Sequence, residues 1–160
     1  MTREEELFQE AVRLVARGFY VDSTDRFRQL IAQHPEGDLA DDASYNIGLS
    51  YFKLNQFEPA LAEFRRTIAD YPEATIDPGE FQNEKGKTAA KAHLGCISCL
   101  LAMGKLNDVK ETLAKLKDYP ESGIVRREGS FKSFHALGEE LIATFEEQQF
   151  LEISEQSSDE

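Results

Sequence analysis

A unit of two amphipathic segments that ends in proline recurs along this chain, and this repeat constrains the fold more than any other sequence feature. The clearest copy is residues 43–72, ASYNIGLSYFKLNQFEPALAEFRRTIADYP. Shifting the sequence back by 37 residues superposes a second copy, in which Ala11 corresponds to Gly48 and Pro35 to Pro72. The chain is therefore expected to be built from stacked copies of one structural unit.

A third copy is recognised by its ending. A shift of 48 residues places Tyr71-Pro72 on Tyr119-Pro120, although Phe57 matches Leu106 only at a shift of 49. The register of this copy therefore slips by one residue within the unit.

Each copy predicts two antiparallel helices joined by a tight turn. A small residue such as Gly48 lets the two helices approach closely. Where the first helix of each pair ends, the sequence has a residue that tolerates a left-handed backbone conformation: Gly18, Asn55 and Gly104. The three prolines end the second helices, because proline cannot continue the helical hydrogen bonds. One such hairpin cannot bury its apolar face alone, so neighbours must stack. We expect an all-α fold, a short right-handed superhelix of antiparallel helix pairs with about seven helices.

The best copy resembles the tetratricopeptide repeat (TPR) family. Ser44 stands where the family has its opening tryptophan, and the resemblance extends over about 120 of the 160 residues. The matching positions are Gly48, Tyr51, Ala60, Phe64, Tyr71 and Pro72.

The repeat boundaries predict one TPR-like domain over residues 3–150. Its repeats are expected at about 4–37, 41–74 and 86–120, followed by a capping helix at about 130–150. Residues 73–87 exceed the family period and are expected to form an inserted surface loop, in which Phe81 either contacts a partner or folds back over the core. Residues 151–160 are expected to be an acidic disordered tail.

The net charge of −12 disfavours nucleic-acid binding, because phosphate contacts need a basic face. The charge is uneven: residues 81–132 carry 10 Lys/Arg against 6 Asp/Glu, whereas residues 133–160 carry 8 Asp/Glu and no Lys or Arg. The N-terminus MTREEELFQE lacks the apolar segment of a signal peptide, and no apolar run reaches membrane-spanning length. We expect a cytoplasmic protein without membrane insertion.

The only candidate for redox chemistry is the pair Cys96 and Cys99, spaced as C-x-x-C. Redox pairs lie at a helix N-terminus, which lowers a thiol pKa, whereas this pair falls inside an apolar helical stretch. A zinc site would need two more ligands at suitable spacing. We interpret both cysteines as core residues, and we expect no catalytic residues, metal or cofactor.

The TPR resemblance implies a concave groove lined by the first helix of each pair. Aromatic and aliphatic side chains with two lysines would suit an extended or helical partner segment held by apolar anchors. For Phe8, Val12, Leu49 and Phe52, packing between helices is an equally good explanation. The implied groove residues are Phe8, Val12, Asp42, Tyr45, Asn46, Leu49, Phe52, Lys53, Lys91, His93 and Ile97, with possible accessory contacts at Phe81, Phe150 and Leu151.

These features favour an adaptor or scaffold that binds another protein in its groove. Size, acidity and the capping helix also resemble the small chaperones of type III secretion, which hold an exported segment. A self-associating structural component, monomeric or homodimeric, is a further alternative. A C-x-x-C redox protein is the explanation that the sequence supports least.

Overall fold

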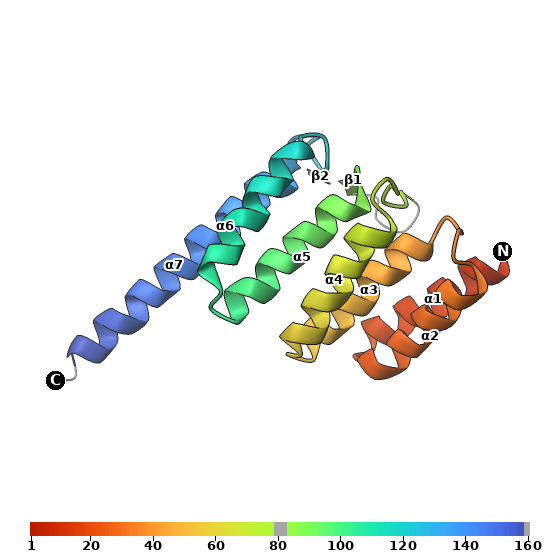
Figure 1. Ribbon diagram of the computed structural model, residues 1–160, viewed down its shortest axis with the longest axis horizontal. Coiled ribbons are helices and arrows are strands. Elements are labelled where there is room, and N and C mark those ends of the chain that lie inside the picture. The colour runs from red at the N-terminus through yellow and green to blue at the C-terminus, as the bar shows by residue number, and fades with distance from the viewer. Residues whose placement is uncertain (79–82, 159–160) are drawn as a thin grey trace.

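The computed structural model describes residues 1–78 and 83–158. Its helices are α1 (Arg3–Ala16), α2 (Tyr20–Gln33), α3 (Ala40–Lys53), α4 (Phe57–Asp70), α5 (Thr88–Ala102), α6 (Leu106–Lys115) and α7 (Phe134–Ser158), with a 3₁₀ turn over Leu116–Asp118. Figure 1 shows them stacked in sequence order as antiparallel pairs. The predicted all-α solenoid of helix pairs is confirmed.

The three turns within the pairs share one geometry. Gly18, Asn55 and Gly104 all have positive φ, at 79°, 57° and 71°. In each turn the next amide N–H donates to the carbonyl five residues earlier, as the 2.9 Å bond from Phe19 N to Leu14 O illustrates. This is the Schellman arrangement, which satisfies the last carbonyls of the first helix.

The aromatic ring of Phe64 lies between two neighbouring helices of the other layer. A Cβ added at Gly48 of α3 would lie 2.7 Å from ring atoms on one side, and a Cβ at Gly95 of α5 would lie 2.8 Å from ring atoms on another. The two glycines therefore let α3 and α5 approach the same ring, which is 1% exposed. A shift of 48 aligns Cys96 with Gly48, so the sequence repeat did not identify Gly95.

A small antiparallel sheet lies beside the N-terminal ends of α5 and α7 and was not predicted. It joins β1 (Glu84–Lys85), β2 (Gly123–Val125) and β3 (Phe131–Ser133) in that order. The inserted segment is thus not only a surface loop: Ile76 is buried, Thr75 pairs with Lys87, and β1 pairs with β2. Phe81 lies outside the described residues.

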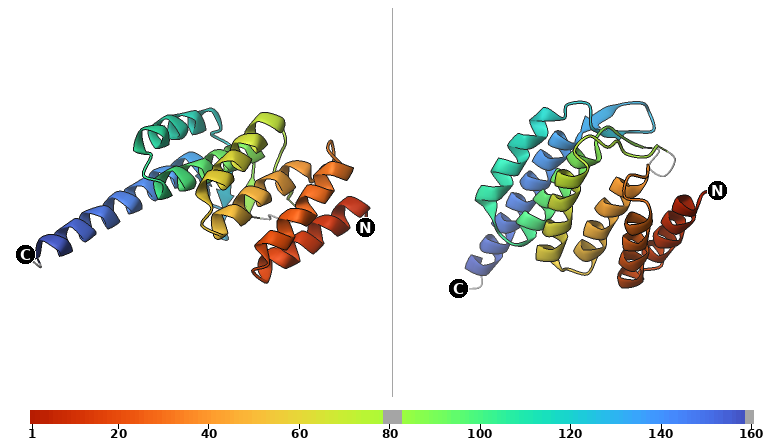
Figure 2. Two further views of the ribbon diagram at one scale, coloured as in Figure 1. Left: turned by 60° about the horizontal axis from the view of Figure 1, so that its bottom comes forward. Right: turned by 45° about the vertical axis from the view of Figure 1, so that its right-hand side comes forward.

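The C-terminal helix differs from its predicted bounds. It begins at Phe134, because residues 131–133 form β3, and it is helical to Ser158 where a disordered tail from residue 151 was predicted. Two further views show the far end of α7 extending past the stacked pairs (Figure 2).

Candidate protein-binding surface

Helices α3, α5 and α7 contact one another in series and form one layer of the array. We call the side of α1, α3, α5 and α7 that faces away from α2, α4 and α6 the inner surface. The family resemblance assigns the partner-binding residues to this surface. Side chains there divide sharply by accessibility. Val12, Tyr45, Leu49 and Phe52 are half-buried and Lys53 is exposed.

The other implied residues lie in the interior. The inserted segment contacts Asp42 and Lys91 at the N-terminal ends of α3 and α5, and α7 packs over Ile97 of α5. Phe8 belongs to the core between α1 and α2. They are therefore corrected from surface contacts to structural residues. The buried set is Phe8, Asp42, Asn46, Lys91, His93 and Ile97.

Each of these buried side chains has an internal neighbour. Phe8 packs edge-on against Phe27, with ring centroids 5.6 Å apart. His93 lies 5.9 Å from the ring of Tyr119, and burial lowers the pKa of this imidazole. His93 therefore packs against the end of the third repeat.

Lys91 is the centre of a polar cluster at the N-terminal end of α5. Its ammonium lies 2.6 Å from the Glu84 carboxylate of β1 and 4.3 Å from the centroid of the Tyr45 ring. The lysine and glutamate side chains are 9% and 18% exposed. The insertion thereby supplies the counter-ion for a lysine that the sequence assigned to partner binding.

Two buried carboxylates adjoin this cluster. Thr88 donates a short hydrogen bond to the Asp41 carboxylate, and Asp42 Oδ2 accepts a 3.1 Å bond from the amide of Asp77. Burial, and then the neighbouring Asp41, raise the pKa of Asp42 to about 8. Asp42 thus ties the insertion to α3 and is not free to meet a ligand.

The half-buried residues farther along α3 form the accessible part of the surface. The ring of Phe52 packs edge-on against Phe57 of α4, with centroids 5.3 Å apart. Leu49 packs on the main core cluster with part of its surface exposed. Lys53 ends the helix, so an apolar strip here lies next to one exposed cation.

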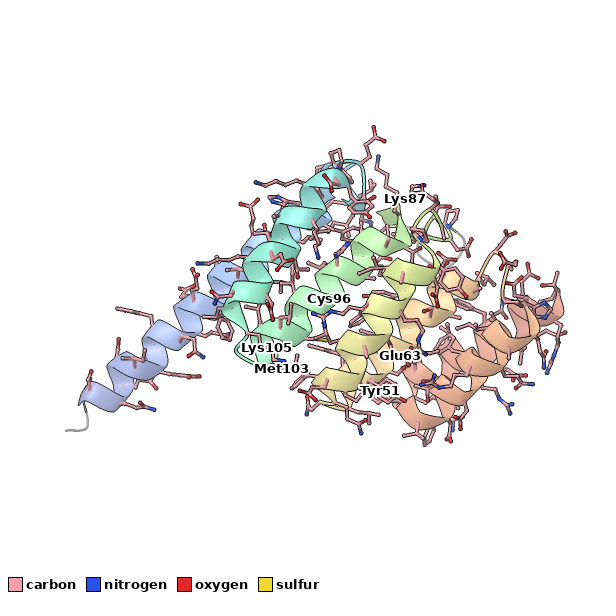
Figure 3. All side chains as sticks on the ribbon, viewed as in Figure 1. Tyr51, Glu63, Lys87, Cys96, Met103 and Lys105 are labelled. Carbon is pink, nitrogen blue, oxygen red and sulfur yellow. The ribbon has the colours of Figure 1, made fainter. Side chains whose placement is uncertain are left out.

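The cysteine pair has no redox geometry. Figure 3 places Cys96 midway along α5, and both thiols are free and buried. Burial raises the pKa of each thiol to about 12. Since the thiolate is the reactive form, the redox hypothesis loses its chemical basis.

Among residues 1–78 and 83–158, no group of His, Cys, Asp and Glu is arranged to hold a metal ion. No helix within these ranges is both long enough and apolar enough to cross a membrane.

Comparison with protein families matches residues 42–74 to the tetratricopeptide repeat. Comparison with curated proteins finds no match. The matched segment covers α3 from its third residue, all of α4 and the turn after α4, where the sequence repeat is clearest. Residues 42–74 are therefore similar to one tetratricopeptide repeat, and they lie within a solenoid of antiparallel helix pairs.

Proposed function

We propose that this protein is an adaptor that binds a segment of another protein along the inner surface. The supporting observation is the row of incompletely buried side chains Tyr45, Leu49 and Phe52, which follow one another by about one helical turn along α3, with Lys53 four residues after Leu49. Large apolar side chains that stay partly exposed in a well-packed repeat are suitable anchors for a docked peptide.

The partner segment is proposed to be apolar with a carboxylate near one end. Leu49 and Phe52 offer aliphatic and aromatic surface, and Lys53 offers a positive charge beside them. The neighbouring Lys91 is already paired with Glu84, so Lys53 is the cation of this strip that we assign to the partner.

The test begins with peptides selected from a random displayed library against the whole protein. Their affinities are then measured by fluorescence anisotropy for the wild type and for the variant Leu49→Lys/Lys53→Glu. We expect an affinity loss of about tenfold or more, because the first substitution removes an apolar anchor and the second reverses the charge beside it.

Val21→Lys is the matched control, because Val21 of α2 is 62% exposed and lies off the inner surface. This variant should bind the selected peptides as the wild type does. Selected peptides that bind all three proteins equally, or a library that yields no binder, would remove the inner surface from consideration.

A further inference from the structure

The two halves of α7 have different surroundings. The first half packs on the main core cluster through Leu137, Ile142 and Phe145. Beyond Phe145, none of the described residues of the helix belongs to either core cluster. The large apolar side chains of this outer half are instead exposed: Phe150 at 70%, Leu151 at 55% and Ile153 at 65%.

Phe150 does not continue the packed stripe of α7. Phe150 follows Phe145 by five residues, which at about 100° per residue rotates it about 140° around the helix axis. Ile153 follows Phe150 by three residues and therefore lies on the same side. Phe150 and Ile153 thus form an exposed apolar strip on the outer half of α7, in which Ile153 lies at nearly the same angle as the packed Ile142. Leu151 lies about 200° around the axis from Ile153, on another side of the helix.

The charge around this strip is entirely negative. Residues 133–160 contain 8 Asp/Glu and no Lys or Arg. Glu146 and Glu147 precede Phe150 by four and three residues, so they lie on the same side of the helix as the strip. Pairing with a second copy of α7 would bring these carboxylates against one another, which is unfavourable.

An isolated helical segment of this length is only marginally stable in water, because helices shorter than about 12–15 residues gain too little from backbone hydrogen bonds alone. The side-chain hydrogen bonds of the outer half, such as the 2.9 Å bond from Ser154 to the Phe150 carbonyl, are local. Packing of a second helix against the strip would stabilise this end of α7 and bury its apolar residues.

We propose that the outer half of α7 is a docking surface for a basic amphipathic helix of another protein. Apolar side chains of that helix cover Phe150 and Ile153, and its flanking Lys or Arg side chains pair with Glu146 and Glu147. This surface lies apart from the inner surface on α3, so each can be tested without the other.

The test uses a defined probe, a fluorescent amphipathic peptide of about 18 residues made of Leu and Lys, and a counterpart made of Leu and Glu. Binding to the full chain is measured by anisotropy at low and high salt. The Lys peptide should bind and weaken with salt, and the Glu peptide should not bind, because the surface is anionic. Phe150→Ala/Ile153→Ala and Glu146→Gln/Glu147→Gln should each weaken Lys-peptide binding about tenfold.

Matched controls separate a specific site from general attraction to an acidic protein. Val21→Ala removes an exposed apolar side chain from α2, and Asp22→Asn/Asp25→Asn removes two exposed charges from the same helix. Both should leave binding unchanged, and circular dichroism should show unchanged helix content for every variant.

Three results would overturn the proposal. The α7 variants could bind the Lys peptide as the wild type does, or the controls could weaken binding equally. Light scattering could also show a wild-type dimer that Phe150→Ala/Ile153→Ala converts to a monomer, in which case a second copy covers the strip.

Discussion

The contact of Phe64 with two glycines gives the sharpest prediction about stability. In Gly48→Ala the new Cβ would approach the ring within 2.7 Å, closer than carbon atoms tolerate. The ring cannot retreat freely, because its other side faces Gly95 of α5. The substitution must therefore displace a ring or separate two helices.

Two opposing effects set the size of the change. Replacing a mid-helix glycine by alanine stabilises the helix by about 1 kcal/mol. Overpacking a rigid core costs about 1–3 kcal/mol. We expect Gly48→Ala to lower the free energy of unfolding by about 1 kcal/mol.

Gly138 of α7 provides the matched control. A Cβ there would meet the methyl ends of Leu113 at 2.9 Å and Ile97 at 3.2 Å. Flexible side-chain ends can rotate aside, so Gly138→Ala should be neutral or stabilising by up to about 1 kcal/mol. Urea unfolding followed by circular dichroism measures both variants.

The double variant Gly48→Ala/Phe64→Leu tests the assigned cause. Because leucine removes the ring that the methyl group meets, the two substitutions together should cost about 1 kcal/mol less than the sum of their separate effects. Additive effects, or a Gly48→Ala protein more stable than the wild type, would refute the proposed close packing.

Three further predictions concern buried polar groups. Burial raises the pKa of Asp42 in the folded protein to about 8, so its contribution to stability is full below about pH 4 and is lost as the pH rises to about 8. Over this range the free energy of unfolding should fall by up to about 1.4 kcal/mol per pH unit. Asp42→Asn should remove this slope in urea titrations. Cys96 and Cys99, with thiol pKa values raised to about 12, should react with a thiol reagent at neutral pH only as fast as the protein opens, and fully in denaturant. Lys91→Met should lower the free energy of unfolding by about 3 kcal/mol because it leaves the half-buried Glu84 without its ion-pair partner, and Lys91→Met/Glu84→Gln should recover part of that loss.

Each of these has a result that contradicts it. An unchanged pH slope in Asp42→Asn would mean that other groups dominate the pH dependence. Rapid labelling of native protein by the thiol reagent would contradict the burial of the cysteines. Strictly additive losses for the lysine and glutamate variants would show that their ion pair contributes no coupling energy.

The sequence by itself determined the repeated helix pairs and the turns within them. Gly18, Asn55 and Gly104 could be identified because a positive φ at a helix end is a local backbone requirement. Pro35 and Pro72 likewise mark the ends of α2 and α4 within two residues, since proline acts through its own ring. Such features depend on neighbours along the chain, so a single sequence reveals them.

Only the tertiary structure decided which inner residues stay accessible. Lys91 was assigned to a partner, but Glu84 of the unpredicted strand β1 neutralises it. Gly95 corresponds to Gly48 only at a shift of 47, which the sequence repeat did not use, and its role became clear only where the ring of Phe64 meets it. Strand pairing, ion pairs and ring contacts join residues distant in sequence, and no local pattern encodes such pairings.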